Sequence, residues 1–248
     1  MTKLAIITGA SKGIGAATAL AFARAGYDIV INYLSDTAAA EATAADARKN
    51  GVKAEIIQSD IFTEAGIHSL RETIGNRLID VLVCNAGLPE EKPYGEWTTT
   101  DILSSLTRNF AGAALCAQEL EPSIKDGGSI LFTSSIYGLP HGASPVLPLY
   151  SAGKAAIISL TQSLAEKLAP RIRCNAVAPG TTKTPAWDGV NPDYAQKSLD
   201  MTLLKEWVTA EEIGKTFVFL AEMPHITAQT VVVDAGWQKK IRSESPVR

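Results

Sequence analysis

Tyr150 and Lys154 are the residues of this sequence whose types and spacing best suit chemistry. They begin and end the stretch Tyr-Ser-Ala-Gly-Lys, and a spacing of four residues places two side chains on one face of a helix. A cation beside a phenol favours the phenolate, so the pair predicts a tyrosine whose pKa of ~10 is brought closer to neutral pH. Such a tyrosine can act as a general acid or base. Taken alone, the pair is also compatible with an ordinary solvated contact, so its meaning depends on the surrounding chain.

A long helix over residues 149–168 must carry this pair, and strands alternate with helices before it. Apolar runs predict strands at residues 3–8, 28–33, 53–58, 79–84, 129–133, 173–177 and 230–233. Further helices are predicted at residues 14–25, 36–49, 63–76 and 99–120.

Short strands separated by helices imply parallel pairing, right-handed crossovers and helices on both faces of one sheet. The sequence therefore predicts an α/β fold. We expect a single Rossmann-type doubly wound domain over residues 1–248, with a seven-stranded, mostly parallel sheet in the order 3-2-1-4-5-6-7.

The turn between the first strand and the first helix is rich in glycine. Residues 8–15 read Thr-Gly-Ala-Ser-Lys-Gly-Ile-Gly. Glycine lets the backbone approach a ligand closely, and the helix that follows presents free N–H groups, so we expect a pyrophosphate to bind here. The spacing Gly-x-x-x-Gly-x-Gly differs from the Gly-x-Gly-x-x-Gly dinucleotide fingerprint. A plain glycine-rich connection is the alternative.

Composition and charge argue against several classes of function. The net charge of −3, with scattered basic residues, predicts neither a nucleic-acid nor a membrane partner. The cysteines and histidines are isolated and lack the spacing of disulfide frameworks or metal sites, so we expect no metal: Cys84, Cys116, Cys174, His68, His141 and His225. No apolar run approaches ~20 residues, so a soluble, cytoplasmic protein is expected.

Residues 180–204 contain two prolines and little clear periodicity, so we expect a mobile lid over the substrate rather than a plain surface excursion. The apolar side chains of this region predict a partly hydrophobic substrate: Trp187, Tyr194, Leu199, Leu203, Leu204 and Trp207. Residues 238–248 are expected to form a short frayed C-terminal tail.

Along nearly its whole length the chain resembles the classical short-chain dehydrogenase/reductase (SDR) family. An ordered series of motifs carries the resemblance, and no single member does. The series comprises the turn at residues 8–15, Asp60, Asn85-Ala86-Gly87, Asn109, Ser135, Tyr150 with Lys154, and Arg173-Cys174-Asn175-Ala176-Val177-Ala178-Pro179-Gly180.

The resemblance implies four catalytic residues. Tyr150 would give a proton to a carbonyl oxygen, and Ser135, rather than Ser134, would donate a hydrogen bond to the same oxygen. Lys154 would hold the nicotinamide ribose and lower the pKa of the phenol. Asn109 would bind a water that links Lys154 to solvent. Read alone, Asn109 would be a polar residue inside a helix, satisfied by the backbone.

The cofactor-binding residues implied by the resemblance are Gly9, Ser11, Lys12, Gly13, Ile14, Gly15, Tyr33, Ser35, Asp60, Ile61, Asn85, Ala86, Gly87, Tyr150, Lys154, Pro179, Gly180, Thr182 and Thr184.

The end of the second strand bears on the choice between NADP(H) and NAD(H). Family members that use NAD carry an acid there that binds the ribose hydroxyls, whereas this chain has Tyr33-Leu34-Ser35. Lys12 resembles the basic residue that NADP-using members place near the 2′-phosphate. The arginine that often follows the second strand in those members is absent. The sequence favours NADP(H) over NAD(H).

Three departures from the family pattern stand out. Gly153 replaces the usual serine before Lys154, so a small contact on the cofactor side is expected to be lost. The loop over residues 138–150 is longer than usual and is expected to shape specificity. Cys84 replaces the more frequent asparagine before Asn85, which we interpret as a change in packing.

The leading hypothesis is an NADP-dependent oxidoreductase that reduces a ketone, an aldehyde or a 3-oxoacyl thioester, or oxidises the corresponding alcohol. The alternatives are a nucleotide-binding regulatory or scaffold protein of the same fold, and an epimerase or dehydratase, which belongs with longer family members. The resemblance implies a homotetramer, or a homodimer, in which the helix of Tyr150 packs against its mate. Small residues on this helix suit such close contact: Ala152, Ala155, Ala156 and Ser159.

Overall fold

Seven short apolar segments form one parallel sheet in the computed structural model, which describes residues 2–89 and 92–237. The strands are β1 (Leu4–Ile7), β2 (Asp28–Tyr33), β3 (Ala54–Gln58), β4 (Ile79–Cys84), β5 (Ile124–Thr133), β6 (Arg173–Pro179) and β9 (Thr230–Val233). Their order is β3-β2-β1-β4-β5-β6-β9, and every neighbouring pair is parallel. The predicted fold class and strand order are confirmed, with β9 as the predicted seventh strand.

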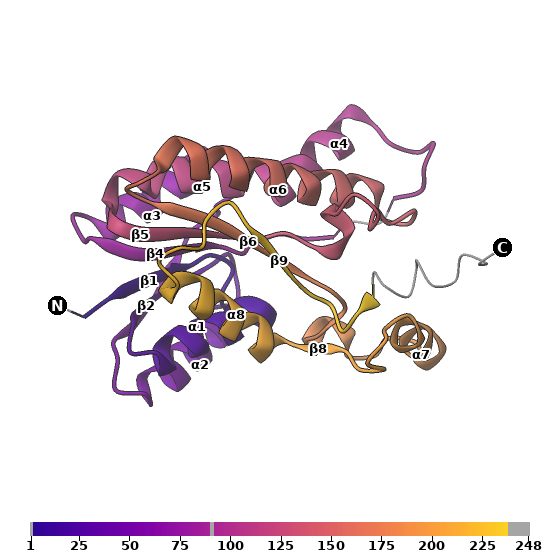
Figure 1. Cartoon of the computed structure of the whole chain (residues 1–248), viewed down its shortest axis with the longest axis horizontal. Helices are drawn as coiled ribbons and strands as arrows, with labels where there is room; N and C mark the ends of the chain where they lie inside the picture. Colours follow the sequence, from indigo (N-terminus) through magenta and orange to yellow (C-terminus); the bar gives the residue numbers. More distant parts are fainter. Residues whose placement is uncertain (1, 90–91, 238–248) are drawn as a thin grey trace.

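Helices cover both faces of this sheet (Figure 1). On one side lie α1 (Gly13–Arg24), α2 (Thr37–Arg48) and α8 (Ala210–Glu222). On the other lie α3 (Glu64–Ile74), α4 (Thr99–Leu106), α5 (Gly112–Leu120) and α6 (Pro148–Leu168). Helix α8 packs along α1, and the sequence reasoning did not predict it. None of the helices among the described residues is long and apolar enough to cross a membrane.

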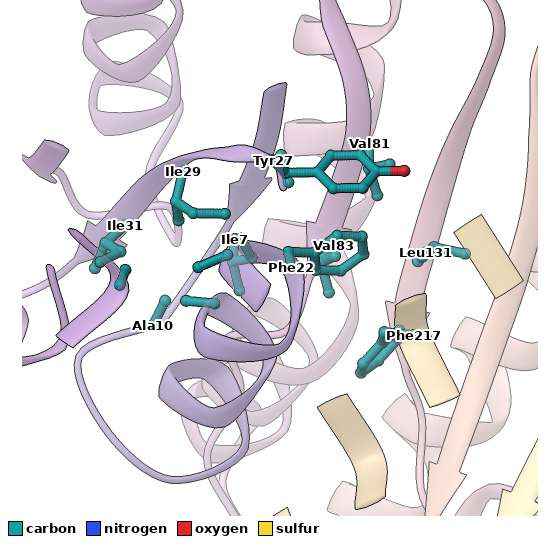
Figure 2. Packing of buried hydrophobic residues seen from close by; sticks show 14 of the residues in the cluster. Ile7, Ala10, Phe22, Tyr27, Ile29, Ile31, Val81, Val83, Leu131 and Phe217 are labelled. Atoms are coloured by element: carbon teal, nitrogen blue, oxygen red, sulfur yellow. The ribbon is translucent and has the colours of Figure 1, made fainter. Parts of the chain in front are cut away.

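Alternating side chains of the strands divide the core into two layers. Val81 and Val83 of β4 point to the side of α1 and α8, where they join Phe22 and Phe217 (Figure 2). Leu82, between them, joins the layer beneath α3, α5 and α6. Each such side chain is at most 2% exposed, and full burial of one contributes about 1.5–3 kcal/mol. The buried sheet therefore fixes the positions of the residues that follow its strands at the carboxyl edge.

The helix predicted over residues 99–120 is interrupted at its centre. Between α4 and α5 lies η1 (Thr107–Ala111), a π-helical turn that contains Asn109. Such turns widen the helix by one residue and occur often at functional sites. Helix propensity does not reveal the interruption, because the side chain of Asn109 makes hydrogen bonds to Leu88, which lies outside this helix.

The predicted lid has more regular structure than expected. It contains β7 (Thr182–Lys183), η4 (Pro185–Trp187) and α7 (Pro192–Asp200), and β7 pairs with β8 (Val208–Thr209). Asn191 caps α7 by accepting a hydrogen bond from Asp193 N at 2.8 Å. The sequence interpretation missed this cap and the proline that follows it at the first helical position. The predicted tail, residues 238–248, lies outside the described residues.

Candidate active site

A cavity of about 890 Å³ lies at the carboxyl edge of the sheet. Parallel strands bring the segments that follow them to one edge, which is where ligands bind in open α/β sheets. The predicted site residues line this cavity, with four exceptions: Tyr33, Asp60, Ile61 and Asn109. Residues far apart in the chain are thus brought together largely as predicted. No cluster of metal-ligating side chains occurs within residues 2–89 and 92–237.

The glycine-rich turn presents an uncapped helix end to the cavity. Helix α1 begins at Gly13, and its N-cap residue, Lys12, makes no side-chain hydrogen bond to the first turn. The first N–H groups of α1 are therefore available to an anion. Gly9 has a φ of +62°, and a Cβ on Gly15 would lie 2.3 Å from the carbonyl oxygen of Gly9. The turn needs both glycines, and it fits the pyrophosphate of a dinucleotide.

Two asparagine side chains hold this turn to the neighbouring strands. Asn85, directly after β4, donates to Thr8 O at 3.1 Å and accepts from Thr133 Oγ1 at 3.1 Å. Asn32, buried in β2, accepts from Gly9 N at 3.4 Å. Sequence reasoning did not single out Asn32, although a buried asparagine needs such partners. Asn85 therefore links the ends of β1, β4 and β5, a structural role in addition to the cofactor binding that the sequence predicts for it.

Ser135 and Tyr150 bring two hydroxyl groups together at the end of β5. The Ser135 side chain lies near enough to the Tyr150 phenol to lower its pKa, and its Oγ accepts from Tyr137 N at 3.1 Å. The hydroxyl of Ser134 instead donates to the main-chain oxygen of Lys154 at 2.8 Å. Ser134 therefore anchors helix α6, while Ser135 is the serine that can reach a substrate oxygen beside Tyr150.

Burial governs the pKa of the Tyr150 phenol. It raises the pKa to about 12, against the opposing effect of the Ser135 hydrogen bond. Lys154 Nζ lies 5.5 Å from the centroid of the Tyr150 ring, but the expected fall of the pKa toward neutrality does not occur. That prediction is wrong for this structure, because desolvation of the phenolate outweighs the nearby cation. The phenol is protonated at neutral pH, as a proton donor must be.

Lys154 is a buried cation that the main chain holds. Its side chain is 3% exposed, and Nζ donates to Thr133 O at 2.9 Å. Burial lowers the pKa of Lys154 from its ordinary value of 10.5 to about 8. The ammonium is therefore kept close to the point of losing its proton near neutral pH.

Asn109 lies beside Lys154 but behind the cavity wall. Its amide donates to Leu88 O at 2.9 Å and to Ser105 O at 3.0 Å, and it accepts from Leu88 N at 3.1 Å. The backbone thus satisfies this side chain, as expected for an isolated asparagine. A Cβ on Gly87 would lie 3.1 Å from both Asn109 Oδ1 and Lys154 Nζ. The missing side chain of Gly87 leaves space next to both groups.

Gly153 allows helix α6 to approach the π-helical turn closely. A Cβ on Gly153 would lie 2.9 Å from the Cβ of Asn109, which is closer than such atoms pack. The side-chain direction at position 153 thus points to Asn109. The expectation of a lost contact on the cofactor side is wrong, because the glycine serves the packing of Lys154 against Asn109.

Lys12 does not stand alone at its end of the cavity. Its Nζ lies 2.7 Å from Asp36 Oδ2, and both residues line the cavity. Asp36 also caps helix α2 by accepting from Ala39 N at 3.0 Å. The Lys12 ammonium and this N–H hold the pKa of Asp36 below its usual range. Sequence reasoning looked for an acid only at residues 33–35 and missed Asp36, the next residue.

Three predicted cofactor residues lie behind the cavity surface. Tyr33 is 5% exposed and its hydroxyl accepts from Thr37 Oγ1 at 3.2 Å, while Ile61 is 3% exposed. The carboxylate of Asp60 accepts from Phe62 N at 3.0 Å. Phe62 lines the cavity in place of all three. These three residues do not line the cavity in this structure, and their contact with the cofactor stays a prediction.

Aromatic side chains wall the part of the cavity nearest to Tyr150. Trp187 and Tyr194 were expected there from the lid, whereas Tyr137 was not predicted. Leu147 lines the cavity from the long loop at residues 138–150. The remaining apolar lid residues do not line it: Leu199, Leu203, Leu204 and Trp207. Hydrophobicity marked the lid but could not say which of its side chains point inward.

Known proteins match this chain over nearly its whole length. The sequence model of a protein family described as Enoyl-(Acyl carrier protein) reductase matches residues 9–238. A 3-oxoacyl-[acyl-carrier-protein] reductase from Synechocystis sp. is 34% identical over 242 residues, which cover 94% of this chain and 96% of the relative. Glucose 1-dehydrogenase 2 from Bacillus subtilis is 34% identical over 248 residues, which cover 94% of each chain.

Solved structures of known proteins also match this chain over nearly its whole length. The crystal structure of a short chain dehydrogenase from Burkholderia cenocepacia in complex with NADP has a TM-score of 0.88 and 30% identity, and the match covers 95% of this chain and 98% of that one. These relatives share the architecture but differ in the substrates that their names state. The substrate of this chain therefore does not follow from similarity alone.

The first prediction concerns Gly153. Gly153→Ala should lower the free energy of unfolding by about 1–3 kcal/mol, because the added methyl overpacks against Asn109. At an unconstrained helix position, alanine stabilises a helix by about 1 kcal/mol relative to glycine. A loss of stability on this substitution would therefore be due to the contact with Asn109. Urea denaturation measures the effect. Ser163→Ala, at an exposed position of the same helix, should change the value by less than about 0.5 kcal/mol. A Gly153→Ala protein at least as stable as the parent would contradict the close contact.

The second prediction follows from the pKa of Lys154. Between pH 8 and 10.5 the unfolded chain binds a proton at this lysine more tightly than the folded protein does. Stability should therefore rise with pH through this window, by up to about 1.4 kcal/mol per pH unit. Lys154→Met removes this contribution. Urea denaturation of both proteins at pH 8, 9 and 10 should give a steeper rise for the parent, and parallel pH profiles would refute the lowered pKa.

Proposed function

The chain belongs to the classical short-chain dehydrogenase/reductase family, and from this we propose an NADP-dependent oxidoreductase that reduces a ketone, an aldehyde or a 3-oxoacyl thioester, or oxidises the corresponding alcohol. The observation that carries the proposal is that Ser135 and Tyr150 lie close together on the wall of the cavity. Two hydroxyl groups that converge on one point suit a carbonyl oxygen, which needs both a proton and a hydrogen bond as it becomes an alkoxide.

The residues of the chain divide the work of such a reduction. A bound nicotinamide supplies the hydride that the carbonyl carbon receives. Tyr150, protonated at neutral pH, gives its proton to the oxygen on which negative charge develops. Ser135 stabilises the same oxygen by a hydrogen bond. Lys154, with Nζ 5.5 Å from the Tyr150 ring centroid, favours the phenolate that remains after the transfer.

The phenolate must then regain a proton. We assign Asn109 a place in this step, with a water between it and Lys154. Support comes from the nearness of the two groups, since Lys154 Nζ and Asn109 Oδ1 each lie 3.1 Å from the point that a Cβ on Gly87 would occupy. A site bounded by an ammonium and a carbonyl oxygen suits a water molecule.

A protein that only binds nucleotide is the competing function, and Tyr150→Phe separates the two. The variant keeps the ring, so NADPH should bind with nearly unchanged affinity in a fluorescence titration. Loss of the proton donor should lower kcat by about 10²–10⁴-fold in an NADPH-oxidation assay with a panel of carbonyl compounds. Ser163→Ala, at an exposed position of the same helix, is the control. A parent protein that binds NADPH but reduces no compound of the panel would favour the scaffold.

We propose that NADP(H) is preferred over NAD(H) and that Lys12 provides the preference. The carboxylate of Asp36 weakens this preference, because it forms an ion pair with the Lys12 ammonium and repels a 2′-phosphate. Lys12→Ala should lower the NADPH/NADH ratio of kcat/KM, and Asp36→Asn should raise it, each by roughly 5-fold. Asparagine also caps helices, so α2 should persist. Asp46→Asn on the exposed side of α2 is the matched control. An unchanged ratio in Lys12→Ala, or NADH as the better donor in the parent, would refute the proposal.

We further propose a homotetramer or homodimer in the cytoplasm, with residues 180–204 acting as the lid. The outer face of α6 supports the assembly, because small residues stand exposed along it: Ala152, Ala155 and Ser159. Helices with such faces can pack closely. Light scattering at micromolar concentration should give the mass of four chains, and a monomeric mass would exclude both assemblies.

A further inference from the structure

One wall of the cavity beside Tyr150 is a fixed aromatic ring. Tyr137 lies in η3 (Ile136–Gly138), directly after Ser135 and Ile136. Its ring packs edge-on against Tyr150, with centroids 6.5 Å apart, and against Trp237, with centroids 5.9 Å apart. Its N–H donates to Ser135 Oγ at 3.1 Å. The ring is therefore held in place by the same residues that would carry the chemistry.

A second group of aromatic side chains reaches the same cavity from the lid. Trp187 of η4 stacks on Tyr194 of α7, with ring centroids 5.9 Å apart and planes inclined by 17°. Trp207 packs behind Trp187 at 4.6 Å between centroids, and its Nε1 donates to Ser198 Oγ at 2.8 Å. Trp187 and Tyr194 line the cavity, whereas Trp207 does not. The rings of Trp187 and Tyr194 are therefore nearly parallel, and Trp207 packs against Trp187.

The two walls lie within electrostatic reach of one another. Burial raises the pKa of Tyr137, and the phenol of Tyr194 raises it further. Neither hydroxyl makes a hydrogen bond to any residue within 2–89 or 92–237. Both phenols can therefore offer a hydrogen bond to a ligand between them.

The charges of the cavity do not suit an anionic substrate. Among the described residues that line it, the charged ones are Lys12, Asp36 and Lys154. Lys12 and Asp36 neutralise one another at 2.7 Å, and Lys154 Nζ is engaged by Thr133 O at 2.9 Å. No cation in this group is free to receive a carboxylate or phosphate of the substrate.

Resting on the carbonyl chemistry proposed above, we infer that the substrate is a planar, uncharged ring ketone whose ring lies between Tyr137 and the Trp187–Tyr194 pair. Contacts between aromatic rings contribute about 0.5–1.5 kcal/mol each beyond the area that they bury. A linear 3-oxoacyl chain gains no such contacts and loses more conformational freedom on binding. A rigid ring is therefore the better occupant of this cavity.

Binding of an unreactive ring tests this inference without any turnover. The probe is 2-naphthol, which is planar and uncharged and has no carbonyl group, titrated calorimetrically into the full-length protein with NADP⁺ present. S-hexanoyl-N-acetylcysteamine is the linear thioester for comparison. We expect 2-naphthol to bind at least about 10-fold more tightly, which corresponds to about 1.4 kcal/mol.

Substitutions at the lid wall identify the contact. Trp187→Leu and Tyr194→Leu should each weaken 2-naphthol by about 5- to 10-fold and leave the thioester within about 2-fold. Tyr194→Phe keeps the ring and should retain most of the affinity. Tyr94→Leu, which removes an aromatic ring that is 87% exposed and outside the cavity lining, should change neither ligand. Equal weakening of both ligands by Tyr194→Leu and by Tyr194→Phe would overturn the assignment.

Turnover then separates this inference from the function on which it rests. NADPH oxidation with 2-tetralone should exceed that with S-acetoacetyl-N-acetylcysteamine in kcat/KM by at least about 10-fold. Faster reduction of the thioester would overturn the ring ketone while upholding the carbonyl reductase. Tight, Trp187-dependent binding of 2-naphthol without reduction of any carbonyl compound would uphold ring recognition and refute the reductase.

Discussion

The buried ammonium of Lys154 is the interaction on which the rest of the site depends. A cation without a partner cannot be placed in a protein interior without a large penalty, and here the partner is the main-chain oxygen of Thr133 at 2.9 Å. This bond ties helix α6 to the end of β5, and the bond from Ser134 to the main-chain oxygen of Lys154 ties it a second time. Tyr150, one turn earlier on α6, is thereby placed beside Ser135. The close approach also explains why Gly87 and Gly153 lack side chains.

The cavity has one region suited to the cofactor and another suited to an apolar substrate. Backbone N–H groups at the start of α1, with the Lys12–Asp36 pair nearby, suit the phosphate and ribose groups of a dinucleotide. Aromatic rings around Tyr150 suit an apolar ligand. A low-dielectric environment around the phenol follows from these rings, and it raises the pKa of Tyr150 to about 12. The same apolar walls that would hold a substrate thus keep the proton on the residue that must deliver it.

Local patterns in the sequence predicted most of the sheet but less of the lid. Continuous apolar runs such as that of β4 can only be buried strands in an alternating chain, so seven strands and their order could be predicted. The lid helix α7 is nine residues long and has no buried residue, so no run of core residues marked it in the sequence. The helix interruption at Asn109 was hidden for a related reason, because a π-helical turn arises from contacts to Leu88 and Ser105 and not from the residues within it.

The sequence by itself predicted the candidate catalytic residues and the cofactor turn. Spacing along the chain indicated Tyr150 with Lys154 and the glycines before a helix start, and the family resemblance added Ser135 and Asn109. Only the tertiary structure decided the direction in which the Tyr150 pKa moves, the pairing of Lys12 with Asp36, and the choice of Tyr137, Trp187 and Tyr194 as cavity walls. Each of these depends on burial or on contact between segments distant in sequence. Residue type and spacing specify which groups are present, but desolvation and distance specify what those groups do.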